Sequence, residues 1–225
     1  MKKAVVISPH FDDMEFGCGG YIQSLIKDGY EVHSYVVCSA DMKMRLSEDV
    51  LAPDIRIQEG ARAAKVLGVN PDITVMGAPY NNLYAGALEH VVGFVEQALK
   101  KHSPDLLFIP LPSFHQDHQA VFTACIAALR PTAVWKGLKV LAYEYPMIAW
   151  GSSEPSGQIQ GAAYHPISEE VLATKIEAIS CHKSQVHGKE DSITGNEGVK
   201  ALARIRGLEC GYDYAEKFHV VKEYL

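Results

Sequence analysis

Short apolar runs alternate with longer segments of helical periodicity along this chain. The pattern predicts buried strands at residues 3–8, 31–38, 72–76 and 105–109. Each is followed by a segment whose apolar spacing is typical of a helix, at residues 17–28, 54–67, 87–102 and 117–129. Four successive strand–helix pairs predict a mostly parallel sheet with helices on both faces, which is a Rossmann-like three-layer α/β fold.

The second half of the chain continues less regularly. We expect strands at residues 139–144, 160–165 and 218–222, and helices at residues 169–181 and 196–208. Ser168 and Asp54 are candidate N-caps, and Gly68 is placed to end a helix. Because no repeat, low-complexity tract or flexible linker interrupts the pattern, we expect one domain over residues 1–225.

Composition and charge narrow the class of protein. With 225 residues, of which 48% are hydrophobic, the chain can bury a sizeable core. The net charge of −6 disfavours a broad nucleic-acid surface, which needs a basic face. No apolar stretch approaches the length of a membrane span, and the first apolar run meets His10 and Asp12 too early for a signal peptide. We therefore expect a cytoplasmic protein.

The five cysteines are odd in number and widely spread, and none forms a CxxC pair. A disulfide framework or a structural zinc site would show paired spacings. The pattern favours free thiols in a reducing compartment.

The candidate chemistry follows the first and fourth predicted strands. Residues 10–13 read HFDD and residues 115–118 read HQDH. Ligands of open parallel sheets bind beyond the carboxyl ends of the strands, and neighbouring strand tips lie roughly 5–10 Å apart. Two imidazoles and a carboxylate from these loops suit Zn²⁺ or Fe²⁺ and leave positions open for water. The alternative is that the Asp pair caps a helix or forms a turn, and that the histidines are structural.

These residues belong to a longer resemblance. The segment SPHFDDMEFGCGG at residues 8–20 resembles the HPDD signature of the LmbE/PIG-L family of metal-dependent N-acetylglucosaminyl deacetylases. FHQDH at residues 114–118 resembles the family's HPDH segment. Further matches begin at Arg56, at Lys175 and at Arg206, in the family's order and over almost the whole chain.

The resemblance implies a zinc-dependent hydrolase that removes the N-acetyl group from an N-acetylated amino sugar or sugar conjugate. His10, Asp13 and His118 would bind the metal, with Fe²⁺ as the alternative to Zn²⁺. Asp12 would be the general base that takes a proton from metal-activated water. The expected partner is a small-molecule amino sugar, and a homo-oligomer is compatible with the resemblance.

Three further roles follow from the same resemblance. His115 would be protonated and would stabilise the oxyanion, and Asp117 would orient His115 and favour its charged form. Arg56 would contact a substrate or product carboxylate; the alternative is an ion pair with Glu59 on the same helical face, and the two roles are compatible.

Two positions depart from the family pattern, because Phe11 and Gln116 replace prolines. Neither supplies a ligand, and we expect Phe11 to pack beneath its loop. The glycines at residues 17–20 lack the GxGxxG spacing, so close packing of a helix is favoured over nucleotide binding. Two other functions stay open: a non-catalytic Rossmann-like module that binds a sugar or nucleotide, and a deacylase of another N-acyl amine.

Overall fold

The computed structural model describes residues 1–43, 50–81, 83, 88–131, 135–146, 161–185 and 192–224. The strands are β1 (Lys3–Ser8), β2 (Glu31–Cys38), β3 (Met42–Lys43), β4 (Val50–Leu51), β5 (Thr74–Ala78), β6 (Leu106–Pro110), β7 (Lys139–Tyr143), β8 (Ala162–Ile167) and β9 (Tyr214–Lys222). The helices are α1 (Asp13–Lys27), α2 (Pro53–Leu67), α3 (Leu88–His102), α4 (Gln116–Ala128), α5 (Glu169–Ser180) and α6 (Asn196–Cys210).

Seven of these strands form one sheet in the order β5-β2-β1-β6-β7-β9-β8. β1 pairs in parallel with both β2 and β6, and only β9 runs against its neighbours in the described sheet. The predicted mostly parallel sheet is confirmed. The strand order reverses between β1 and β6, so the crevice in which such sheets bind ligands lies beyond the carboxyl ends of these two strands.

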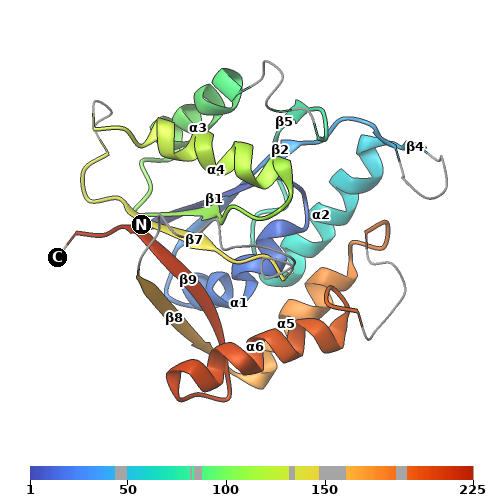
Figure 1. The fold of residues 1–225 in the computed structure, drawn as a ribbon, viewed down its shortest axis with the longest axis vertical. Helices are drawn as coiled ribbons and strands as arrows, with labels where there is room; N and C mark the ends of the chain where they lie inside the picture. The colour runs from blue at the N-terminus through green and yellow to red at the C-terminus, as the bar shows by residue number, and fades with distance from the viewer. Residues whose placement is uncertain are drawn as a thin grey trace.

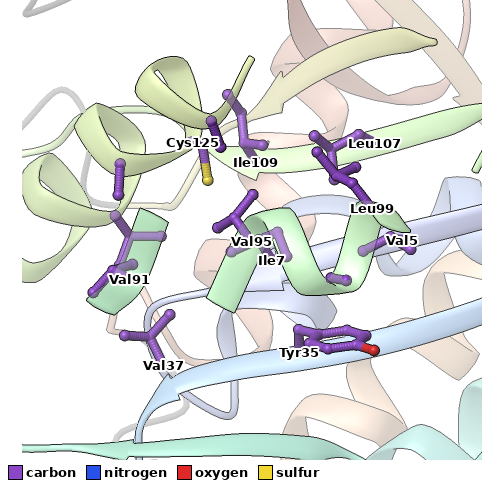
Figure 2. Close-up of a cluster of buried hydrophobic side chains, with 14 of the residues drawn as sticks. Val5, Ile7, Tyr35, Val37, Val91, Val95, Leu99, Leu107, Ile109 and Cys125 are labelled. Carbon is purple, nitrogen blue, oxygen red and sulfur yellow. The ribbon is translucent and has the colours of Figure 1, made fainter. Parts of the chain in front are cut away.

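Helices cover both faces of the sheet, as predicted. Figure 1 shows α3 and α4 together on the upper side of the sheet, and α1, α2, α5 and α6 on the other side. Because side chains alternate along a strand, Val5 and Ile7 of β1 lie in the core beneath α3 and α4. Figure 2 shows this core, to which α3 contributes Val91, Val95 and Leu99.

The opposite face of β1 packs against α1 and α2. Ala4 and Val6 lie there with Met14, Ile22 and other apolar side chains. A strand that is buried on both faces carries a continuous apolar run rather than an alternating one, which is why residues 3–8 were recognisable from sequence.

The predicted boundaries hold best where the apolar pattern is strongest. β1 and β2 span the predicted residues, and Ser168 caps α5 by accepting from the Val171 N–H. The predicted cap at Asp54 is wrong, because Pro53 occupies the first helical position and Ala52 is the N-cap. The short β3–β4 hairpin was not predicted.

The start of α1 differs from the prediction in a way that matters for the site. The helix begins at Asp13 rather than at residue 17, and its first turn carries Asp13 and Glu15. Carboxylates near a helix N-terminus are stabilised by the helix dipole. The acidic segment thus belongs to the helix itself.

Close packing explains the glycines of α1. A Cβ on Gly17 would lie 2.1 Å from Cδ2 of Tyr143 in β7, so no other residue fits without a shift. The packing interpretation is confirmed for Gly17 and for Gly20, where a Cβ would lie 2.8 Å from Ile167 Cγ2, whereas a Cβ on Gly19 would make only ordinary contacts. All five cysteines are free, and Cys18, Cys38 and Cys125 are buried. Among the described helices, none has the length and apolar character needed to cross a membrane.

Candidate active site

The loops after β1 and β6 meet, as their pairing requires. The ring centroid of His10, in the first loop, lies 4.8 Å from that of His115 in the second. It lies 5.4 Å from the ring centroid of His118, which stands in the first turn of α4. The predicted juxtaposition of the two motifs is therefore present.

His10, Asp13 and His118 form a group of ligand atoms that all lie within 4.8 Å of one another. Asp13 stands between the imidazoles: Oδ2 is 3.4 Å from His10 Nδ1, and Oδ1 is 3.2 Å from His118 Nε2. Asp13 is fully buried, and its Oδ1 accepts no hydrogen bond from any residue that the structure describes. An orphaned buried carboxylate oxygen between two imidazole nitrogens fits a divalent cation.

The charge on Asp13 suits such a ligand. Burial alone would raise its pKa, but the neighbouring His118 and His10 imidazoles hold it well below the usual range. The carboxylate is ionised at neutral pH, as metal binding requires.

Asp117 contacts the far side of the His10 ring. Its Oδ2 lies 3.1 Å from His10 Nε2 and accepts a 2.9 Å hydrogen bond from the Asn81 N–H. Burial lowers the pKa of His10, but the bonds with Asp117 and Asp13 raise it well above its ordinary value. A cation that displaced the Nδ1 proton would leave the Nε2 proton hydrogen-bonded to Asp117, which is the arrangement of a metal-ligating histidine backed by a carboxylate.

The expectation that Asp117 orients His115 holds only through the Asp117 backbone, because the carboxylate itself is directed to His10. Asp117 Oδ2 is 3.9 Å from His115 Nδ1, and that nitrogen instead accepts from the Asp117 backbone N–H at 3.2 Å. Burial, followed by the charges of His10 and His118, lowers the pKa of His115 to about 4, although Asp117 opposes the shift. His115 is thus neutral at pH 7 rather than protonated, and as an N-cap acceptor at Nδ1 it carries its proton on Nε2.

Asp12 and Asp13 point to different partners. Asp12 occupies the N-cap position of α1 but makes no capping hydrogen bond with its side chain. Its Oδ1 lies 3.3 Å from Arg56 Nη2. The simple capping alternative therefore does not account for Asp12. The two side chains reach different partners at the point where α1 begins.

Arg56 faces the site rather than its own helix. It donates a 2.8 Å hydrogen bond from Nη1 to the Tyr80 hydroxyl, and its guanidinium lies over the rings of Tyr80 and Phe11. Glu59 instead accepts from the backbone N–H and the hydroxyl of Ser184. The alternative pairing of Arg56 with Glu59 is wrong.

These side chains open onto a cavity of about 230 Å³. Its lining residues are His10, Asp12, Phe16, Met42, Arg56, Tyr80, Asn81, Ser113, Phe114, His115, His118, Tyr145, Gln185 and Thr194. Tyr80 was not predicted, although it stacks on His10 with the ring centroids 5.5 Å apart. Its position after the third strand was the available signal. Among the residues that follow the predicted strand ends, Asn81 and Tyr145 line the cavity, whereas Asn82, Tyr84, Trp150 and residues 152–160 lie outside the described residues.

Comparison with known proteins gives this arrangement a family. Residues 5–129, more than half of the chain, match the family model described as PIG-L: GlcNAc-PI de-N-acetylase. The chain belongs to the PIG-L family.

Relatives and solved structures agree with that membership. The chain is 25% identical over 189 residues to the uncharacterized deacetylase YaiS of Escherichia coli K12, covering 81% of this chain and 91% of YaiS. It is 25% identical over 218 residues to a probable N-acetyl-alpha-D-glucosaminyl L-malate deacetylase 2 of Bacillus cereus, covering 92% and 94%. The crystal structure of the zinc-inhibited form of teicoplanin deacetylase Orf2 superposes with a TM-score of 0.77 at 17% identity, covering 97% of each chain, and shows the shared fold.

Membership in the PIG-L family, together with the group of His10, Asp13 and His118, suggests a divalent metal in this site. The replacement of the two family prolines by Phe11 and Gln116 does not disturb this group of ligands. Phe11 is 2% exposed and packs against α2, where a Cβ on Gly60 would lie 2.8 Å from Phe11 Cδ1. Gln116 donates from Nε2 to the Asn81 carbonyl at 2.9 Å and links two loops of the site.

Proposed function

We propose that this protein is a metal-dependent deacetylase that hydrolyses the N-acetyl group of an N-acetylated amino sugar or sugar conjugate. One observation carries the proposal: the two histidines of the metal-ligand group, His10 and His118, and a separate buried carboxylate, Asp12, line one cavity at the carboxyl ends of β1 and β6. The family description and the Bacillus cereus relative both name N-acetylglucosaminyl compounds, which supports an amino-sugar substrate.

His10, Asp13 and His118 would hold the cation. Two imidazoles and one carboxylate suit Zn²⁺, and the same set also suits Fe²⁺. When bound, such a cation lowers the pKa of water and polarises a carbonyl oxygen.

Asp12 is the proposed general base. It lines the cavity, and Arg56 holds its Oδ1 while leaving the carboxylate beside the ligand group. As a general base it would take the proton of the attacking water. The protonated carboxyl group would then act as a general acid and give that proton to the departing amine. The remaining donor capacity of Arg56 is available to a carboxylate or hydroxyl of the substrate or product.

His115 is proposed to stabilise the developing oxyanion in its neutral form. With Nδ1 engaged by the Asp117 N–H, the Nε2–H is the donor that remains for the substrate. A fixed donor aimed at a developing negative charge lowers the barrier without reorganisation.

The test is acetate release together with metal content. The wild-type protein is expected to bind about one equivalent of zinc or iron and to release acetate from an N-acetylglucosamine conjugate. His118→Ala should lose both properties, whereas replacing the exposed His90 of α3 with alanine should lose neither.

A panel of N-acetylated sugars and other N-acyl amines separates the remaining functions. If the protein releases acid only from the non-sugar amides, the proposed amino-sugar substrate is wrong but the proposed hydrolase activity stands. A protein that cannot be loaded with metal and releases no acetate would instead support a non-catalytic binding module.

A further inference from the structure

Cys38 lies beside the site without a role in the proposed reaction. It ends β2, and its backbone N–H donates a 2.9 Å hydrogen bond to the Pro9 carbonyl, directly before His10. The side chain is fully buried. The thiol therefore sits next to the loop that carries the first imidazole of the ligand group.

His10, Cys38 and Asp117 form a second group of ligand atoms within 4.8 Å of one another. His10 Nε2 and Asp117 Oδ2 are 3.1 Å apart. Two ligand atoms that each lie about 2 Å from a tetrahedral zinc ion are roughly 3.3 Å apart. The distance between His10 Nε2 and Asp117 Oδ2 is therefore close to that between two ligands of one zinc ion.

Asp117 supplies an independent observation. It is fully buried, and its Oδ1 accepts no hydrogen bond within the part of the chain that the structure describes. A buried carboxylate oxygen without such a bond is costly unless a cation or donor satisfies it.

We propose that His10, Cys38 and Asp117 form a second, inhibitory site for a thiophilic divalent cation such as Zn²⁺, Co²⁺ or Cd²⁺. A thiolate and an imidazole select such cations over Mg²⁺ and Ca²⁺, which prefer oxygen ligands. On binding, a sulfur–metal bond replaces the S–H bond of Cys38, and the thiol proton leaves to solvent. The proton of neutral His10 moves from Nε2 to Nδ1, which faces Asp13, so that Nε2 is free to bind the cation.

Inhibition follows from the shared histidine. His10 directs Nδ1 towards Asp13 and Nε2 towards Asp117. A neutral imidazole offers one unprotonated nitrogen, so His10 serves one cation at a time. A cation held by Cys38 thus withdraws His10 from the first group. This consequence rests on the proposed function, whereas the binding itself does not.

Cobalt titration of the full-length protein tests the binding. A thiolate ligand gives Co²⁺ a sulfur-to-metal charge-transfer band in the near ultraviolet, and the wild type is expected to develop this band as cobalt is added. Cys38→Ala and Cys38→Ser should both lose it. Cys125→Ala should keep it, because Cys125 is equally buried in the same apolar core but is absent from both ligand groups.

A second experiment measures acetate release by each protein with and without added zinc. Zinc above one equivalent should suppress acetate release by the wild type. In Cys38→Ala, the half-inhibiting zinc concentration should rise at least about tenfold, since even the loss of an outer-shell partner costs that much affinity. A wild type that binds cobalt without the band, or a band that survives both Cys38 substitutions, overturns the proposal.

The two proposals fail separately. The loss of metal and activity in His118→Ala, without any thiolate band in the wild type, would keep the deacetylase and remove the second site. A Cys38-dependent band in a protein that releases no acetate from any amide would do the reverse.

Discussion

At the carboxyl end of the sheet, the His10 ring lies between two buried carboxylates, whereas at the amino end His33 and His102 stack on each other. The two rings of the second pair have centroids 3.7 Å apart, and the only carboxylate paired with either in the described chain is Glu31, on His33. His102 Nε2 instead hydrogen-bonds the Tyr35 hydroxyl at 2.8 Å.

The pKa values of His10 and His102 shift in opposite directions. Burial opposes the charged form of both histidines, but Asp117 and Asp13 outweigh it and raise the pKa of His10. At the other end, burial is reinforced by His33, Lys101 and Lys3, and the pKa of His102 falls to about 4, with Glu31 opposing. Buried imidazoles alone therefore do not make a cation site; the carboxylates between them do.

Removing the carboxylate of Asp13 should make the cluster around His10 resemble the His33–His102 pair, which lacks a carboxylate between its imidazoles. Asp13→Ala is expected to abolish metal binding and activity together, because the variant leaves two imidazoles without the anionic ligand that stands between them. Zinc stoichiometry and acetate release on the same sample measure this. Full metal occupancy in Asp13→Ala would show that Asp13 is not a ligand.

Asp12→Asn tests whether the neighbouring carboxylate serves a different purpose. The variant should retain its metal but lose the proton acceptor, so kcat should fall by on the order of 10²–10⁴. Metal content measured beside kcat distinguishes the roles. If Asp12→Asn is metal-free while Asp13→Ala stays loaded, the two assignments are reversed.

Asp117→Asn sharpens the comparison, because it removes a carboxylate that acts through His10. We expect metal affinity to fall about 10–100-fold, as is usual for the loss of an outer-shell carboxylate. Competition with a metal chelator measures the affinity. Asp72→Asn, the same substitution at an exposed residue away from the site, is the control. Unchanged affinity in Asp117→Asn would contradict the positioning of His10.

The smallest effect is expected at the amino end, as a dependence of stability on pH. The pKa of His102 is about 4 when folded and ordinarily 6.5, so the unfolded chain binds the proton more tightly. This contribution to the free energy of unfolding is complete above pH 6.5 and is lost as the pH falls towards 4. His102→Gln should therefore give a flatter profile than the wild type in this window.

Urea denaturation between pH 4 and 7, at one fixed metal loading, measures that slope. His90→Gln is the control, because His90 is exposed on the same helix. Parallel profiles for the wild type and His102→Gln would contradict the assignment.

Local patterns were sufficient for much of the fold and for the candidate ligands. β1 and β2 were predicted to the residue, and the apolar run of β1 is uninterrupted from Ala4 to Ile7 because this strand is buried on both faces. The metal-ligand group was predictable because its members directly follow two parallel strands, and such strands present their carboxyl ends at one edge. The start of α1 was missed because the acidic residues resembled a loop, although carboxylates are favoured in a first helical turn.

The sequence by itself thus determined the layered fold, the location of the site and the residue types available for a cation. Only the tertiary structure decided which side chains meet: that the Asp117 carboxylate holds His10 rather than His115, that Arg56 contacts Asp12 rather than Glu59, and that Cys38 and Tyr80 flank His10. These contacts join residues far apart in the chain. They depend on the order β2-β1-β6 and on where each helix begins, and a difference of one residue in a helix turns a side chain by about 100°.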